Sequence, residues 1–209
     1  GTIPRKSVTV MHNLNSRDIP KAIPKTHSPI GRCIGSVILK VMGWRIEGAF
    51  PSDAKFIAAV APHTSNWDFV IAIAVKLKLG LKVQFLGKHR IFIGPFGYLL
   101  KKLGGIAVDR SAAHGVVEQI TQQFNQQDAL ILGLAPEGTR KYTKQWKTGF
   151  LYMASAANVP VVPMRLDYRS KTFTVLPALD IAHDIKSELT RFKQLFPKEV
   201  AKYPSQVSD

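Results

Sequence analysis

Short apolar runs of strand length alternate with stretches of helical spacing along most of this chain, and this alternation limits its fold more than any other feature. Strands are predicted at residues 44–47, 56–61, 83–86, 106–108, 129–134, 161–164 and 173–176. Helices are predicted at residues 69–79, 95–103, 112–125, 149–157 and 184–196. Such an alternation is typical of an α/β fold, here a single domain with a mostly parallel central sheet flanked by helices.

The N-terminal part differs from this alternating region. Residues 1–29 hold four prolines, several basic residues and few apolar ones, so we expect a basic arm that is mobile or loosely docked. The domain itself is placed at residues 30–209. It opens with a predicted amphipathic helix, whose apolar stripe consists of Ile30, Ile34, Val37, Ile38 and Val41. We expect this stripe to pack on the core, and the alternative is an interfacial helix among lipid headgroups.

Charge and hydropathy restrict where such a protein works. The formal charge of +15 predicts attraction to an anionic surface, either phospholipid or nucleic acid. No stretch of the sequence reaches the roughly 18–20 uninterrupted apolar residues of a membrane span. We therefore expect a cytoplasmic protein that binds peripherally to the inner face of a membrane.

The sequence gives no reason to expect a metal or a disulfide. The single cysteine, Cys33, cannot form a disulfide within the chain, and we expect it to be a packed small residue. The sequence also lacks the clustered histidines and carboxylates that are typical of a zinc site. No metal ion and no cofactor are expected.

A histidine and an aspartate lie five residues apart, where a predicted strand gives way to a predicted helix. His63 is the side chain best suited to accept a proton near neutral pH, and Asp68 could hold its imidazole in one tautomer. On an unbroken helix such residues point about 140° apart, so the chain must bend between them. Pro62, Ser65 and Asn66 permit that bend. The plainer alternative is that Asp68 only caps the helix.

Three further segments follow in order. Residues 105–110 end a short strand with Arg110, residues 135–140 read Ala-Pro-Glu-Gly-Thr-Arg, and residues 159–163 are a strand-like run framed by prolines. Together with the His63…Asp68 block they resemble the glycerolipid acyltransferase superfamily, the family of 1-acylglycerol-3-phosphate acyltransferases. The resemblance covers roughly residues 44–180, the motif core of the predicted domain. Ala107 stands where that family has an aromatic residue, which leaves the acyl acceptor open.

The resemblance implies an acyltransferase in which His63 is the general base and Asp68 orients it. It also implies an acceptor-binding role for Glu137, Gly138, Thr139 and Arg140. Glu137 would accept a hydrogen bond from an acceptor hydroxyl or from a site arginine. The Pro-Glu-Gly-Thr sequence is equally typical of a turn with Gly138 at positive φ. Backbone N–H groups near Gly138 are candidates for stabilising the oxyanion.

Basic residues supply candidates for a phosphate site. Arginine matches phosphate geometry with two parallel hydrogen bonds, so Arg110 and Arg140 are the expected phosphate ligands, with Lys88 a third. The expected reaction moves a fatty acyl group from acyl-CoA or acyl-carrier protein to the free hydroxyl of a lysophospholipid in phospholipid biosynthesis. The acceptor that the resemblance implies is 1-acylglycerol-3-phosphate.

Other functions remain open at this stage. Within the same superfamily, the chain could be a phospholipid–lysophospholipid transacylase or could acylate another lyso-lipid, such as lyso-ornithine lipid. A basic nucleic-acid-binding domain is the alternative outside enzymes, although the charges are spread along the chain and form no recognised nucleic-acid motif. A non-catalytic lipid-binding module is the last alternative, and the presence of both His63 and Asp68 argues against it.

Overall fold

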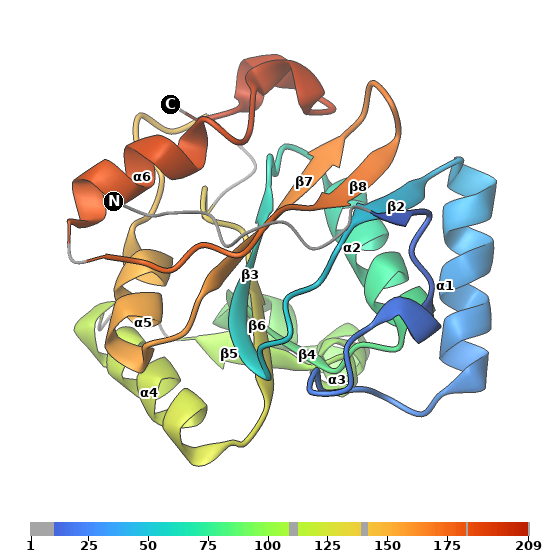
Figure 1. The fold of residues 1–209 in the computed structure, drawn as a ribbon, viewed down its shortest axis with the longest axis horizontal. Helices are drawn as coiled ribbons and strands as arrows, with labels where there is room; N and C mark the ends of the chain where they lie inside the picture. The colour runs from blue at the N-terminus through green and yellow to red at the C-terminus, as the bar shows by residue number, and fades with distance from the viewer. Residues whose placement is uncertain (1–10, 109–112, 139–141, 183, 209) are drawn as a thin grey trace.

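The computed structural model describes residues 11–108, 113–138, 142–182 and 184–208. A central sheet separates two groups of helices (Figure 1). The strands within the described residues are β1 (Met11–His12), β2 (Arg45–Gly48), β3 (Lys55–Ala61), β4 (Val83–Lys88), β5 (Gly105–Val108), β6 (Leu130–Leu134), β7 (Val161–Asp167) and β8 (Thr172–Val175). The α-helices are α1 (Pro29–Met42), α2 (Asn66–Leu79), α3 (Gly94–Lys102), α4 (Ala113–Gln126), α5 (Gly149–Ala157) and α6 (Ile185–Lys193).

The sheet order is β1-β2-β8-β7-β3-β6-β4-β5. The pairs formed by β3, β4, β5 and β6 with one another, and the β3–β7 and β2–β8 pairs, are parallel. Only the β1–β2 and β7–β8 pairs among the described strands are antiparallel. The predicted α/β domain with a mostly parallel sheet is confirmed.

Alternate residues of β3 face two separate cores. Phe56 and Ala58 belong to the core beneath α1 and α2, whereas Ile57 and Ala59 belong to the core beneath α4, α5 and α6. This is the two-sided burial expected of a central parallel strand, which reads as a continuous apolar run. The sheet therefore carries helices on both faces, as Figure 1 shows.

The N-terminal arm, which we expected to be mobile or loosely docked, packs on the domain from residue 11 onward. Leu14, Ile19 and Ile23 are at most 5% exposed and join the core beneath α1 and α2. β1 pairs with β2, and Lys25 forms an isolated bridge with Leu81. The prediction is wrong for residues 11–28, because a few well-spaced apolar side chains are enough to anchor a proline-rich segment. Residues 1–10 lie outside the described part.

Helix α1 faces the opposite way from our expectation. Gly35 lies so close to α2 that a Cβ atom there would come within 2.5 Å of the Ala74 carbonyl oxygen, and Leu39 is buried. Of the predicted apolar stripe only Ile38 packs against the core, as expected. The other four residues, Ile30, Ile34, Val37 and Val41, are 75%, 48%, 54% and 81% exposed. Cys33 is also exposed rather than packed. Because α1 buries a narrow small-residue face, its larger apolar face is left to solvent.

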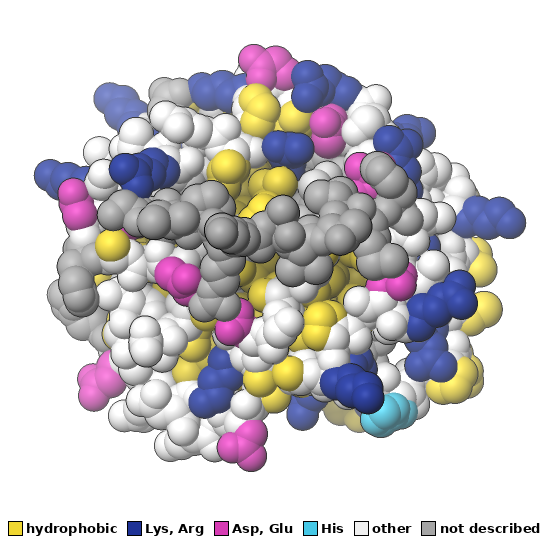
Figure 2. All heavy atoms as spheres, in the orientation of Figure 1, with side chains coloured by type: hydrophobic (Ala, Val, Ile, Leu, Met, Phe, Trp, Pro, Cys, Tyr) yellow, Lys and Arg dark blue, Asp and Glu magenta, His cyan; other side chains and the backbone are white. Residues whose placement is uncertain are grey.

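The surface is predominantly basic. Lys and Arg side chains are spread over the face shown in Figure 2, with acidic side chains between them. Of the helices that the structure describes, none combines the length and the apolar character needed to cross a membrane.

Candidate active site

Three neighbouring strands bring the candidate residues to one edge of the sheet. β3, β6 and β7 run parallel, with β3 between the other two. His63 follows β3, Glu137 follows β6 and Tyr168 follows β7 directly. The carboxyl ends of parallel strands are where open α/β sheets place their ligands, so these three loops define the candidate site.

The start of α2 fixes the position of Asp68. Ser65 is the N-cap, and its hydroxyl accepts a hydrogen bond from the Trp67 N–H at 3.1 Å. Asp68 stands at the third helical position and accepts a hydrogen bond from the Ser65 N–H at 2.7 Å, which completes a capping box. The helix therefore begins at Asn66, three residues before its predicted start. Asp68 does cap the helix, as the plainer interpretation of the sequence held.

Capping does not exclude contact with the histidine. Asp68 Oδ2 also accepts from the Thr64 N–H at 2.7 Å and lies 3.2 Å from His63 Nδ1. Asp68 is 2% exposed, whereas the His63 side chain is 23% exposed. The bend that the sequence required is present, because His63 lies in the loop before the N-cap. The buried carboxylate thus contacts one ring nitrogen of a partly exposed histidine.

Glu137 shapes the loop that carries His63. It is fully buried, and its two carboxylate oxygens accept from the His63 N–H at 2.6 Å and from the Ser208 N–H at 3.4 Å. Burial raises the pKa of Glu137 to about 7, although these two backbone hydrogen bonds act in the other direction. Glu137 therefore holds backbone groups of two segments, and its predicted contact with an acceptor hydroxyl or a site arginine stays a prediction.

Gly138 forms the turn that its sequence context predicted. Its φ is +70°, and its N–H donates to the Ala135 carbonyl at 3.0 Å. A Cβ atom at Gly138 would come within 2.8 Å of Lys147 Cγ. Because the turn already uses the Gly138 N–H, this group is a poor candidate for stabilising an oxyanion.

A large cavity opens beside His63. Its volume is about 2340 Å³ and His63, Thr64, Gly138 and Lys147 are among its lining residues. Apolar side chains from α2, α3, α4 and α5 make up much of the wall: Phe69, Val70, Ile73, Phe96, Leu100, Val116, Val117, Phe150 and Met153. Lys147 is the one basic side chain among the described lining residues. A cavity of this size and lining suits a long aliphatic ligand with a polar end.

Several predicted ligands cannot be placed. Arg110, Thr139 and Arg140 lie outside the described residues. Lys88 ends β4 at the same edge of the sheet as His63, and its side chain is likewise outside the described part. Their roles remain those that the sequence suggested.

The C-terminal segment contributes to the site in a way that the sequence did not indicate. The Tyr203 N–H donates to Thr64 Oγ1 at 3.2 Å, and Trp146 Nε1 donates to the Ser208 carbonyl at 3.0 Å. Lys202 lies 5.3 Å from the ring centre of Trp67, which lines the cavity. No local sequence pattern predicts these contacts, because the residues that form them are 62 to 139 residues apart.

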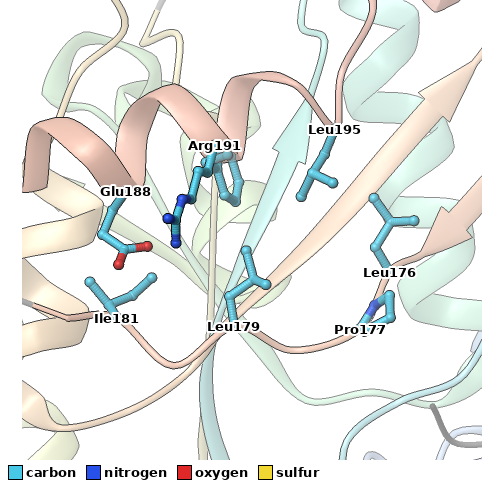
Figure 3. Close-up of a pocket in the computed structure, with 8 residues that line it drawn as sticks. Leu176, Pro177, Leu179, Ile181, Glu188, Arg191 and Leu195 are labelled. Carbon is cyan, nitrogen blue, oxygen red and sulfur yellow. The ribbon is translucent and has the colours of Figure 1, made fainter. Parts of the chain in front are cut away.

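A second, smaller cavity lies elsewhere. It has a volume of about 320 Å³ and is formed by α6 and the segment that follows β8 (Figure 3). Glu188 and Arg191 extend from α6 toward Leu179 and Ile181. It shares no described lining residue with the cavity beside His63.

Comparison with known proteins assigns this fold and site to a class. A family model described as Acyltransferase matches residues 45–167. The chain belongs to this family and is an acyltransferase of the glycerolipid superfamily, as the ordered segments suggested.

Its relatives are more specific. The 1-acyl-sn-glycerol-3-phosphate acyltransferases of Escherichia coli (strain K12) and Salmonella typhimurium are 23% and 24% identical to it, and each match covers 89% of this chain and 84% of the relative. The crystal structure of the 1-acyl-sn-glycerophosphate acyltransferase PlsC from Thermotoga maritima has the same fold, with a TM-score of 0.52 and 18% identity. That match covers 79% of this chain and 78% of the other.

Proposed function

We propose that this protein transfers a fatty acyl group from an acyl thioester to the free hydroxyl of a lysophospholipid, with 1-acylglycerol-3-phosphate as the acceptor. The observation that carries the proposal is the contact between the buried Asp68 and Nδ1 of His63, which lines a large cavity with many apolar side chains. The acceptor is the one for which the two bacterial relatives are named. The donor is acyl-CoA or acyl-carrier protein.

The reaction needs a base but no enzyme nucleophile, because the thioester is already activated. Since Nδ1 faces Asp68, Nε2 of His63 takes the proton of the acceptor hydroxyl. The hydroxyl oxygen then forms a bond to the thioester carbonyl carbon, which gives a tetrahedral oxyanion. When the C–S bond breaks, the proton on Nε2 passes to the departing sulfur. The products are an ester and a free thiol, and His63 is neutral again.

Replacement of His63 tests this mechanism. General base catalysis contributes about 10²–10⁴-fold, so His63→Ala should lose that much turnover while its thermal melt stays close to that of the wild type. The measurement is release of free thiol from an acyl thioester in the presence of lysophosphatidate. His89→Ala, which changes a histidine without a role in the proposal, is the control. A folded His63→Ala protein with wild-type turnover would refute the base assignment.

We also propose that the protein works at an anionic membrane surface. Exposed apolar side chains gather on α1 and at the start of α3, and we call this set the apolar rim: Ile30, Ile34, Val37 and Val41 of α1, with Ile93, Phe96 and Leu99 at α3. One residue of each helix, Ile38 of α1 and Phe96 of α3, also lines the cavity. Exposed apolar residues on a basic protein are typical of an interfacial surface.

The other possibilities have distinct signatures. A transacylase would use a diacyl phospholipid in place of the thioester, and an enzyme for another lyso-lipid would reject lysophosphatidate. A nucleic-acid-binding domain would show retention of nucleic acid, with no lipid. Mass spectrometry of lipids that copurify with the protein, together with donor and acceptor panels, separates these outcomes.

A further inference from the structure

The Asp68 carboxylate has a partner that the acyltransferase segments do not contain. Tyr168 directly follows β7, and its hydroxyl donates a hydrogen bond to Asp68 Oδ1. The family match ends at residue 167, one residue before this tyrosine. The other oxygen, Oδ2, accepts from Thr64, Ser65 and His63. The two oxygens of one buried carboxylate are thus held by different parts of the chain.

Tyr168 is itself held firmly. Its ring meets Trp44 edge to face, with ring centres 4.9 Å apart, and its N–H donates to the Val200 carbonyl at 2.7 Å. Burial, followed by the contact with Asp68, raises the pKa of Tyr168 well above its usual value, so its hydroxyl remains a donor across the working range of pH. The Tyr168 hydroxyl therefore donates its one hydrogen bond to Asp68 Oδ1.

The position of Tyr168 separates it from the substrates. It is not among the residues that line the large cavity, whereas His63 is. The hydrogen bond to Asp68 is the contact that connects the Tyr168 hydroxyl to His63. A second charged group, Glu137, also lies near His63, but it contacts the backbone of His63 rather than Asp68.

We propose that Tyr168 is a positioning residue for acyl transfer: its hydroxyl fixes the rotation of the Asp68 carboxylate, so that Oδ2 stays aimed at His63 Nδ1. This inference rests on the proposed role of His63 as the base. Without the tyrosine hydroxyl, Oδ1 would be a buried acceptor that has lost a partner, and the carboxylate could rotate to recover one. The imidazole would then be held less often in the tautomer that leaves Nε2 free to accept a proton.

Tyr168→Phe removes one oxygen atom and keeps the ring contact with Trp44. We expect kcat to fall about tenfold or more, since hydrogen bonds to charged groups are among the stronger ones. The KM values for thioester and acceptor should stay within about twofold. Tyr98→Phe makes the same chemical change at a side chain that is 66% exposed, and should leave kcat unchanged. Thermal melts of each variant establish that the assays are made on folded protein.

A double-mutant cycle asks whether Tyr168 acts through Asp68. If it does, Tyr168→Phe causes little further loss once Asp68→Asn is present. An equal fractional loss in both backgrounds would overturn the proposal, and so would wild-type kcat in Tyr168→Phe. A rise in KM at constant kcat would also overturn it, because it would place Tyr168 against a substrate.

Nitrogen NMR of His63 gives a readout that needs no substrate. In the wild type at alkaline pH, the ring should be mainly the tautomer with hydrogen on Nδ1, and Tyr168→Phe should populate the other tautomer more. The signal is assigned by its loss in His63→Ala. An unchanged tautomer ratio would overturn the positioning role, even where the proposed acceptor or donor proves wrong. Loss of thiol release in His63→Ala tests the base assignment separately.

Discussion

At the scale of single residues, one carboxylate combines helix capping with contact to the proposed base. Asp68 closes the first turn of α2 and contacts His63 with the same oxygen. The cap therefore also helps to hold this oxygen against the His63 ring. Replacement of Asp68 therefore has consequences for stability as well as for activity, and the two must be measured together.

The arginines of the predicted phosphate site can be tested independently of their placement. Arg140→Ala, and to a lesser extent Arg110→Ala, should raise the KM for a phosphate-bearing acceptor about tenfold, because a hydrogen bond to a charged group contributes about 1.5–3 kcal/mol. Initial rates at varied acceptor and varied donor concentrations give the two KM values. Arg45→Ala is the control, since its side chain pairs with Glu47 on β2 and is 54% exposed. A rise in the donor KM alone would place the arginines against the donor.

The buried Glu137 predicts a particular dependence of stability on pH. Its pKa is about 7 in the folded protein, above the value of 4.5 for an exposed glutamate. A raised pKa means that its contribution to stability is fully present below about pH 4.5 and is lost as the pH rises through about 7. Glu137→Gln carries no charge, so the variant should lose less stability than the wild type over this interval.

Thermal or denaturant unfolding at about pH 5 and about pH 8 measures this difference. One unit of pKa corresponds to about 1.4 kcal/mol. Between these two pH values, the wild type should therefore lose at most roughly 3 kcal/mol more of its free energy of unfolding than Glu137→Gln. The amide also changes the hydrogen bonds to His63 and Ser208, but that cost is the same at each pH. Parallel pH dependence in the two proteins would show that Glu137 is not the group that titrates.

At the scale of secondary-structure elements, α1 is the helix whose orientation gives the proposed membrane surface. Nine residues separate Ile30 from Leu39, which places them on opposite sides of a helix that turns about 100° per residue. Leu39 is buried and Ile30 is exposed. The helix is therefore attached to the domain by one side and presents a second apolar side outward.

A charge introduced into the outward side should disrupt membrane binding. Ile34→Glu with Val37→Glu should reduce the fraction of protein that cosediments with lipid vesicles, because burial of these side chains in the headgroup region would become unfavourable. Turnover with short-chain, monomeric substrates should be unaffected. Ser36→Glu adds one such charge to an exposed residue outside the stripe and is the control for each of the single variants, Ile34→Glu and Val37→Glu. Equal vesicle binding by the wild type and the double variant would exclude α1 from the membrane surface.

The sequence predicted the positions of the helices and strands more successfully than the way in which they pack. Periodicity and apolar runs located β2 to β8 and α1 to α6 to within a few residues, because a buried parallel strand is apolar throughout. The two-residue strand β1 was not predicted. The same periodicity revealed the α1 stripe but not its direction, since a stripe can face a core or a membrane. The close approach of Gly35 to Ala74 determines which side of α1 packs on the domain, but a single glycine in the sequence does not predict such an approach.

For the site, local sequence was sufficient only where the chemistry is local. The contact between His63 and Asp68 could be predicted because only five residues separate the loop histidine from the first turn of α2. The contacts of Glu137 with the backbone groups of His63 and Ser208 were not predicted, because 74 and 71 residues separate these partners. Tyr168 was missed, since 100 residues separate it from Asp68. Its position directly after β7, a strand that ends at the same edge of the sheet as β3, could have indicated that Tyr168 lies near the site.

At the scale of the whole molecule, the excess of positive charge gives membrane binding a measurable salt dependence. The charge of +15 should draw the protein to anionic vesicles, and each basic group near the surface contributes about 1 kcal/mol at low salt. High salt should release only part of the protein, because apolar burial by the rim is not screened. Cosedimentation with zwitterionic and anionic vesicles, each at low and high salt, checks this. Negligible binding under all four conditions would point to nucleic acid as the next partner to test.

The order of the sheet also determines when the molecule can be completed during synthesis. β2 is an early strand, but its pairing partners are β1 and β8, and β8 alone connects it to the rest of the sheet. A nascent chain on the ribosome therefore has β1 and β2 before the strand that attaches them exists. Until Thr172–Val175 has left the exit tunnel, β1 and β2 cannot join the sheet, and the core around Leu14 and Ile46 stays incomplete. Chaperones that shield exposed strands have this interval in which to act.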